Sequence, residues 1–169
     1  MIPPWRDRTP DGPLEHPEDP MAVHWKLVVD CADPLRLTAF WAEALGYETE
    51  DNSVLIERLL GMGAIGDELL TVVDGRKAWI HAAAVRHPGD PVDASTGIGL
   101  GRRILFQTVP EPKQGKNRLH MDLHVGPEKR ADEVKRLERL GARVLHVVDE
   151  PGGSHVTMAD PEGNEFCVQ

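Results

Sequence analysis

An internal repeat constrains the fold of this 169-residue chain more than any other feature of its sequence. Residues 23–29 approximate the alternation of apolar and polar side chains that marks a strand, and residues 119–125 repeat that pattern in the second half. In each half a stripe of apolar residues at helical spacing follows, and a glycine ends it, at Gly46 and at Gly141. This recurrence predicts two copies of one supersecondary unit.

The second half of the chain predicts the full unit, a βαβββ module. After its helix, strands are expected near residues 142–148, 155–158 and 165–168, with glycine- and proline-containing turns between them. The repeat therefore predicts an α+β fold made of two such modules.

The first half follows the same plan, with extra residues before its last strand. We expect a helix at residues 53–61, a hairpin turn at Asp74 and Gly75, and a closing strand at residues 104–107. Residues 82–85 stay open between a buried strand and a short helix, because an apolar run of this length does not reveal its period.

These elements divide the chain into four segments. Residues 1–20 are rich in proline and charge, so we expect a disordered or loosely docked lead-in. The other segments are a first module with an insertion at residues 21–109, a linker at residues 110–118 and a second module at residues 119–169.

The composition excludes several classes of partner. The formal net charge of −9 offers no basic surface to a nucleic-acid backbone. No apolar run approaches the ~18 residues of a membrane span, and residues 1–20 lack the apolar core of a secretory signal. Cys31 and Cys167 are too few and too far apart for a disulfide framework. We therefore expect a cytoplasmic protein with reduced cysteines and with neither a nucleic acid nor a membrane as partner.

Four segments, in order along the chain, resemble a known family. They are residues 29–34 before Phe40 and Trp41, residues 106–113, residues 117–123 and residues 159–167. Together they resemble the glyoxalase-like branch of the vicinal oxygen chelate superfamily, which includes glyoxalases, bleomycin-resistance proteins and extradiol dioxygenases. The resemblance implies an open, half-barrel-like mixed sheet with helices on its outer face and a small-molecule cavity on its concave side. It also implies that a homodimer is frequent and that a divalent metal is often bound.

The alternation along the first strand of each module predicts a polar face opposite the helix. The candidate catalytic residues lie on this face: His24, Lys26, His120, Asp122 and His124. The two repeat-related histidines are open to a functional role or to simple hydrogen bonding with neighbours. Lys26 and Asp122 either pair with each other across the cavity or act as acid and base on a carbonyl or epoxide.

The resemblance also implies where a metal would be held, with one ligand on the first strand and one on the last strand of each module. His24 and His120 hold the first-strand places, Gln107 and Cys167 hold the last-strand places, and Glu165 shares a strand face with Cys167. Because an amide is a poor ligand, this set departs from the family pattern and suits zinc better than iron. One divalent ion (Zn, Ni, Mn or Fe), a metal-free cavity, and Cys167 as a buried apolar residue all stay open.

The leading hypothesis for function is a glyoxalase-like protein that binds and transforms a small organic molecule between its modules, by lyase or isomerase chemistry. The alternative is a non-catalytic binding or sequestration protein of the bleomycin-resistance type. The glycines at 97, 99 and 101 precede a strand, which excludes the helix that a dinucleotide-binding loop requires.

The aromatic residues divide between the core and the cavity. Trp25, Phe40 and Trp41 are expected in the core because they fall on the packing faces of their elements. Trp79 and the loop at residues 87–101 are expected to cover the cavity mouth.

Overall fold

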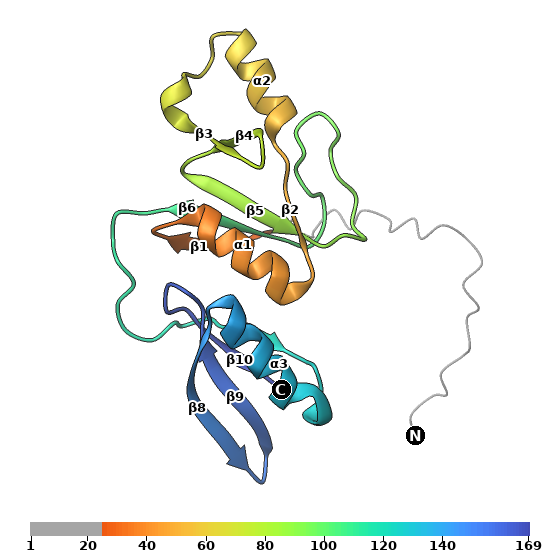
Figure 1. Ribbon diagram of the computed structural model, residues 1–169, viewed down its shortest axis with the longest axis vertical. Coiled ribbons are helices and arrows are strands. Elements are labelled where there is room, and N and C mark those ends of the chain that lie inside the picture. The colour runs from red at the N-terminus through yellow and green to blue at the C-terminus, as the bar shows by residue number, and fades with distance from the viewer. Residues whose placement is uncertain (1–24) are drawn as a thin grey trace, which may run out of the picture.

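The computed structural model describes residues 25–169, which form two four-stranded sheets with one helix packed against each (Figure 1). It confirms the α+β prediction, because each module mixes strands and a helix and the described strands close no barrel. None of the helices in this part of the chain has the length and apolar character to cross a bilayer. The predicted lead-in at residues 1–20 and the candidate His24 lie outside the described residues.

The first sheet comes from β1 (Leu27–Cys31), β2 (Glu48–Thr49), β5 (Ala82–Arg86) and β6 (Arg103–Thr108), and helix α1 (Pro34–Leu45) packs against it. Its strand order is β1-β6-β5-β2, with β1 parallel to β6. Asp33 starts α1 by accepting a hydrogen bond from Arg36 N at 3.0 Å, and Gly46 ends it in the left-handed conformation. Local residues therefore mark both ends of α1, and Gly46 ends it as predicted.

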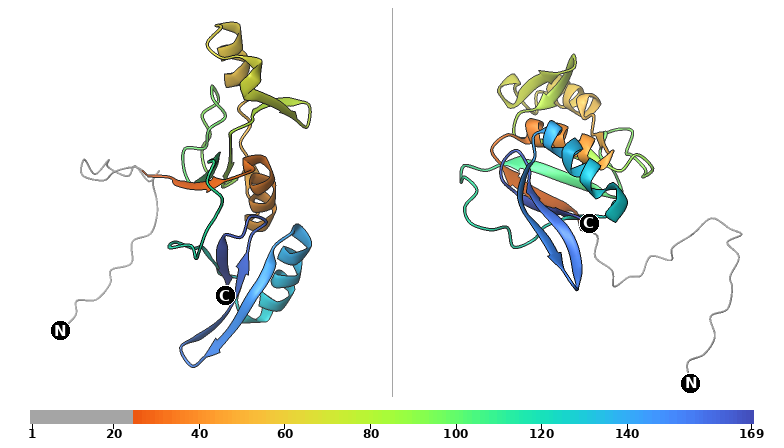
Figure 2. Two further views of the ribbon diagram at one scale, coloured as in Figure 1. Left: turned by 90° about the vertical axis from the view of Figure 1, so that its left-hand side faces the viewer. Right: turned by 60° about the horizontal axis from the view of Figure 1, so that its bottom comes forward.

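The second sheet comes from β7 (Asp122–Leu123), β8 (Arg143–Glu150), β9 (Gly153–Ala159) and β10 (Glu165–Val168), and helix α3 (Pro127–Leu140) packs against it. Its order is β7-β10-β9-β8, with β7 parallel to β10, so it repeats the first sheet strand for strand. Helices α1 and α3 contact each other and lie on the same side of the two sheets (Figure 2).

An insertion separates β2 from β5 in the first module. It consists of α2 (Ser53–Gly61), a 3₁₀ turn (Asp67–Leu69), and a hairpin of β3 (Leu70–Val73) and β4 (Arg76–Trp79). The predicted helix and hairpin turn are confirmed, and Asp74 and Gly75 take φ values of 49° and 77°, as a two-residue type I′ turn requires. Residues 82–85 are a strand rather than a helix because β6 supplies antiparallel partners along their length.

The first strand of the second module is shorter than predicted. We expected a strand over residues 119–125, but only β7, two residues long, pairs with β10. Met121 O, just before β7, still accepts a hydrogen bond from Cys167 N at 2.9 Å, but further upstream Asn117 N donates to the Glu165 side chain, at Oε2 and 3.0 Å. Leu119 is accordingly 80% exposed.

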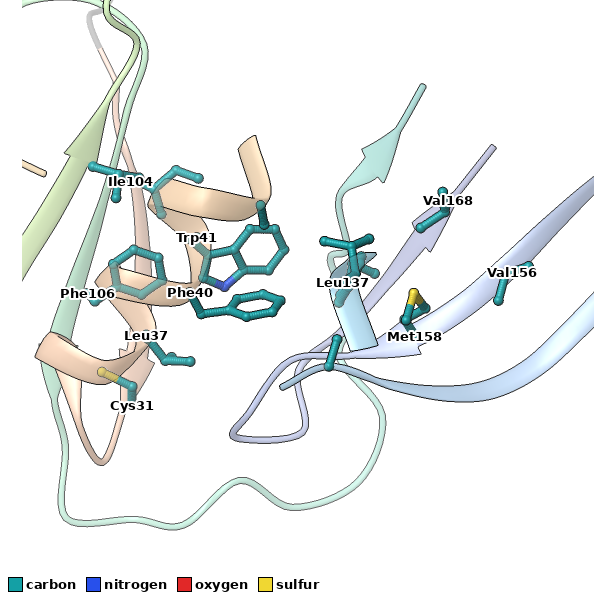
Figure 3. Close-up of a cluster of buried hydrophobic side chains, with 14 residues drawn as sticks. Cys31, Leu37, Phe40, Trp41, Ile104, Phe106, Leu137, Val156, Met158 and Val168 are labelled. Carbon is teal, nitrogen blue, oxygen red and sulfur yellow. The ribbon is translucent and has the colours of Figure 1, made fainter. Parts of the chain in front are cut away.

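One hydrophobic core joins the two modules (Figure 3). Phe40 and Trp41 of α1 are buried in it, as predicted, and the Trp41 ring meets Phe166 of β10 edge-on at 5.2 Å between centroids. Leu137 of α3 is fully buried in the same cluster. The prediction for Trp25 is wrong: it is 85% exposed, because β1 begins only at Leu27 and Trp25 lies outside the strand.

Polar contacts at the 160–164 turn also tie the modules together. The buried Asp160 carboxylate accepts a hydrogen bond from Trp41 Nε1 at 3.2 Å. Glu162 accepts two more, from Ala32 N at 2.8 Å and Asp33 N at 2.7 Å, just ahead of α1. Asp160 and Glu162 of the 160–164 turn therefore have hydrogen-bond partners in the first module.

Candidate functional site

The face of the second sheet opposite α3 carries a compact group of polar side chains. Cys167 of β10 lies directly across from Asp122 of β7 on one side and from Thr157 of β9 on the other. His120 lies two residues before Asp122, and one ligand atom each of His120, Asp122 and Cys167 lie within 4.8 Å of one another. Within residues 25–169, no other three His, Cys, Asp or Glu side chains gather in this way. We call these three residues the His120 cluster.

Asp122 is the centre of this cluster. Its Oδ1 lies 3.3 Å from His120 Nε2, and its Oδ2 accepts a hydrogen bond from Gln169 Nε2 at 2.8 Å. The carboxylate is therefore held at both oxygens, which orients the imidazole. The side chains of His120 and Asp122 are 44% and 36% exposed, so a small molecule from solvent can reach them.

Cys167 closes the cluster from the protein side. Burial raises the pKa of its thiol, and the hydrogen bond between Thr157 Oγ1 and Cys167 Sγ, 3.8 Å apart, lowers that pKa by less than burial raises it. The thiol is therefore protonated at neutral pH and is not an activated nucleophile.

The strand register makes different residues of the two modules equivalent than the sequence repeat did, which aligned His24 with His120. Asp30 lies across from Gln107 as Asp122 lies across from Cys167, and Gln107 Nε2 donates to Asp30 Oδ1 at 3.2 Å. Asp30 is thus the counterpart of Asp122, and two residues earlier the first module has Val28 where the second has His120. His24 lies outside the described residues, six positions before Asp30.

The other predicted site residues lie apart from the His120 cluster. Glu165 is held by Asn117 N and by Lys113 Nζ at 3.2 Å; burial alone would raise its pKa, but these contacts outweigh burial and lower it. Lys26 does not pair with Asp122, and it lines a separate cavity over the first sheet. His124 is exposed just after β7.

A cavity of about 260 Å³ lies between β1 and the segment that leads into β7. Val28 of β1 and His120 are in opposite walls, so both modules build it. Three carboxylates line it and neither lysine nor arginine does; they belong to Asp30, Asp160 and Glu165. Lys113 pairs with Glu165, so the cavity is acidic through Asp30 and Asp160. Its volume lies just below the ~300 Å³ lower end for drug-sized ligands.

The His120 cluster can be tested as a metal site by its donor chemistry. It offers an imidazole nitrogen, a carboxylate oxygen and a thiol sulfur, a set that suits zinc and leaves a fourth place for water or substrate. All three donors come from the second module, whereas the resemblance implies ligands from both. A metal must displace the Cys167 proton, so binding should strengthen as pH rises.

Sequence reasoning missed Gln169. It holds the second oxygen of Asp122, and the available signal was the strand alternation, since Gln169 lies two residues after Cys167 and on the same face.

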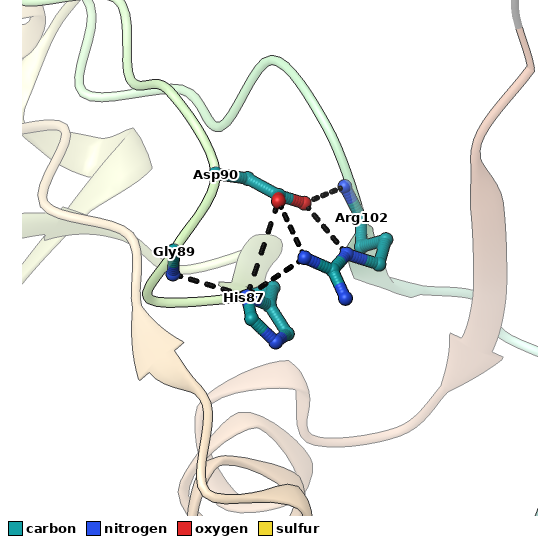
Figure 4. Close-up of polar contacts among 4 residues, drawn as sticks. All are labelled: His87, Gly89, Asp90 and Arg102. Carbon is teal, nitrogen blue, oxygen red and sulfur yellow. Dashed lines mark hydrogen bonds and ion pairs between the residues drawn. The ribbon is translucent and has the colours of Figure 1, made fainter. Parts of the chain in front are cut away.

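The loop at residues 87–101 is closed at its base by a charged cluster (Figure 4). Asp90 accepts hydrogen bonds from Arg102 N at 2.6 Å and Arg102 Nη2 at 2.7 Å, and these contacts hold the pKa of Asp90 well below its usual value. His87 Nδ1 accepts a hydrogen bond from Gly89 N at 3.0 Å. The loop is thereby fixed in position, and its residue Ile98 lines the cavity over the first sheet.

Comparison with known proteins gives the family. A sequence model of the glyoxalase-like domain matches residues 26–169. No curated protein sequence matches the chain.

Three solved structures show the same fold at low identity. The fosfomycin resistance protein FosX from Mesorhizobium loti is 10% identical, with a TM-score of 0.53 over 87% of this chain and 90% of that one. A glyoxalase/bleomycin resistance protein/dioxygenase family enzyme from Burkholderia phytofirmans is 13% identical, with a TM-score of 0.52 over 85% and 94%. FosX from Listeria monocytogenes, solved with Mn(II) and sulfate, is 11% identical, with a TM-score of 0.51 over 88% and 90%. Together with the paired modules, the match across residues 26–169 shows that this chain belongs to the glyoxalase-like domain family of the vicinal oxygen chelate superfamily.

Proposed function

We propose that this chain binds a small uncharged organic molecule between its modules and catalyses an isomerase-type proton transfer through His120. One observation carries the proposal: His120 lines the acidic cavity while Asp122 lies 3.3 Å from its Nε2. A carboxylate in this position fixes the tautomer of a histidine and stabilises the imidazolium that forms when it accepts a proton.

The chemistry needs one base and one proton. With Asp122 on the Nε2 side of the ring, the Nδ1 side of His120 is the one that exchanges a proton with the bound molecule. The C–H bond next to a carbonyl breaks, the proton passes to the imidazole, and the electron pair stays on the substrate as an enolate. Return of that proton to the former carbonyl carbon, with transfer of the hydroxyl proton to the enolate oxygen, completes the isomerisation of an α-hydroxy carbonyl compound.

The charge of the cavity selects the substrate. Three lining carboxylates and no lining lysine or arginine disfavour an anion such as the phosphonate fosfomycin. We therefore propose that the substrate is a neutral α-hydroxy carbonyl compound and not fosfomycin, the antibiotic after which the similar protein FosX is described.

A divalent ion is compatible with this site. His120, Asp122 and Cys167 would hold a zinc-type ion, and such an ion polarises a substrate oxygen. An ion on Nε2 would leave Nδ1 of His120 protonated and unable to accept a substrate proton, so the metal-dependent and metal-free mechanisms respond differently to added zinc.

Exchange of the α-protons of 2-hydroxyacetophenone in D₂O, followed by proton NMR, tests the proposal. We expect catalysed exchange in the native protein, loss of at least tenfold in His120→Gln, and no change in the control His81→Gln, which replaces an exposed histidine outside the cluster. Zinc that abolishes exchange indicates the metal-free base, and zinc that enhances it indicates metal assistance. Exchange at the uncatalysed rate under every condition contradicts the proposed chemistry.

The second candidate is a non-catalytic binding protein. It is favoured by the buried, protonated Cys167 and by Glu165, whose carboxylate is engaged by Lys113 and Asn117. Binding of 2-hydroxyacetophenone without proton exchange is the outcome that this candidate predicts.

A further inference from the structure

A second cavity lies on the first sheet, at a place that has no counterpart in the second module. β8 and β9 are joined by a short turn, whereas β2 and β5 are separated by α2 and the β3–β4 hairpin. A space of about 190 Å³ lies between this insertion, the loop at residues 87–101 and the sheet. Leu105 and Ala84 lie opposite each other on the sheet face that lines it, while their neighbours Ile104 and Phe106 point into the core. We call this space the insertion cavity.

The walls of the insertion cavity are fixed to each other. Gly99 N in the loop donates to Glu50 Oε1 at 2.8 Å, and Asn52 Nδ2 ahead of α2 donates to Thr96 O at 2.9 Å. The loop and the insertion are therefore held together on the sheet before any ligand arrives, so little ordering is needed on binding.

Most of the lining suits a flat apolar group. The side chains of Ala82 and Ala84 point to this face of the sheet, and their small size leaves a level floor. Trp79 stands at one wall with its indole half-buried, and Leu55 and Ile98 add apolar surface. An aromatic ring buries its faces in such a space and stacks or packs edge-on against an indole.

The charged residues of the lining leave one positive charge without a partner. Both carboxylate oxygens of Glu50 accept hydrogen bonds from Arg103, from Nε at 2.7 Å and from Nη2 at 2.7 Å, so these two residues neutralise each other. Lys26 also lines the cavity, and no carboxylate in the described part of the chain lies within ion-pair distance of its amine. The lining thus contains two cations and one anion.

We infer that the insertion cavity is a second binding site, for a small aromatic monoanion. The ring lies over the alanine floor against Trp79, and the acid group meets the amine of Lys26. The two cavities then differ in charge: the intermodule cavity is acidic and suits a neutral molecule, while the insertion cavity has one excess positive charge. This site does not depend on any chemistry at His120.

Titration with phenylacetate and with its neutral analogue phenylacetamide tests the inference on the full chain. The indole N–H signal of Trp79 in proton–nitrogen NMR spectra reports binding, and its absence in Trp79→Phe assigns it. We expect phenylacetate to shift this signal and to bind at least tenfold more tightly than phenylacetamide. Lys26→Met should remove that preference, Lys26→Arg should keep it, and the matched control Lys135→Met on α3 should leave it unchanged.

Two further variants separate the inference from loss of fold and from the proposed function. Ala82→Leu fills the cavity from its floor and should weaken phenylacetate at least tenfold while the spectrum stays dispersed. His120→Gln should leave phenylacetate affinity unchanged, whatever becomes of proton exchange. An unshifted Trp79 signal, equal affinities for acid and amide, or an unaltered preference in Lys26→Met overturns the inference.

Discussion

Replacement of Asp160 by alanine removes a buried carboxylate that joins the two modules. Asp160 is 2% exposed and accepts four hydrogen bonds. Three come from the turn itself, from Glu162 N, Asn164 N and Asn164 Nδ2, each at 2.9 Å, and the fourth comes from Trp41 Nε1 at 3.2 Å.

The expected cost follows from what each donor can do afterwards. The Trp41 indole N–H is buried and stays unsatisfied, at about 1–3 kcal/mol, while the half-buried turn donors regain water and lose about 0.5–1.5 kcal/mol each. We therefore expect Asp160→Ala to lower the free energy of unfolding by about 3–7 kcal/mol, measured by urea denaturation followed by circular dichroism.

A double-mutant cycle with Trp41→Phe isolates the contact between the modules. Because phenylalanine has no N–H that would be left without an acceptor, Asp160→Ala should cost less in that background, by about 1–2 kcal/mol. A coupling energy below about 0.3 kcal/mol, or an Asp160→Ala variant as stable as the native protein, refutes this account of the turn.

Three further predictions concern the loop and the buried thiol. Because Arg102 lowers the pKa of Asp90, the loop's stabilisation is full above the unfolded pKa of ~4 and is lost as pH falls through the folded value. The protection of amides at residues 87–101 against exchange, relative to their intrinsic rates, should therefore fall only in acid, and Asp90→Asn should lower it at neutral pH. Burial raises the pKa of Cys31 to about 12, so iodoacetamide should label it only after unfolding, as mass spectrometry of digests can show. Gly97→Ala puts a Cβ 1.8 Å from Asp51 O at a φ of 74°, so urea denaturation should show a loss of about 1–3 kcal/mol.

Local signals in the sequence predict the helices of this fold well. The ends of α1 lie at a capping aspartate and a left-handed glycine, and the β3–β4 turn lies at Asp74 and Gly75, because each depends on residues next to it in the chain. The length of β7 depends instead on which partner its backbone meets. Asn117 N bonds to the Glu165 side chain and not to a strand, β7 begins only at Asp122, and no local sequence pattern predicts that contact.

The candidate site shows the same division. Strand alternation identifies the face shared by Asp122 and Cys167, and register then brings them together with His120. Alternation does not say which residues of the two modules meet. The sequence therefore left open a pairing of Lys26 with Asp122, whereas the partners of Asp122 in the structure are His120 and Gln169. The insertion cavity needed the tertiary packing of α2 and the loop over the alanines of β5.

The claim that the space between the modules is the ligand site can be tested directly by mapping backbone amide shifts during titration with 2-hydroxyacetophenone. The account predicts that the shifted amides cluster in two segments far apart in sequence, Val28–Asp30 of β1 and residues 117–121 before β7, which share this cavity. Shifts confined to the insertion, or no shifts at all, would contradict it.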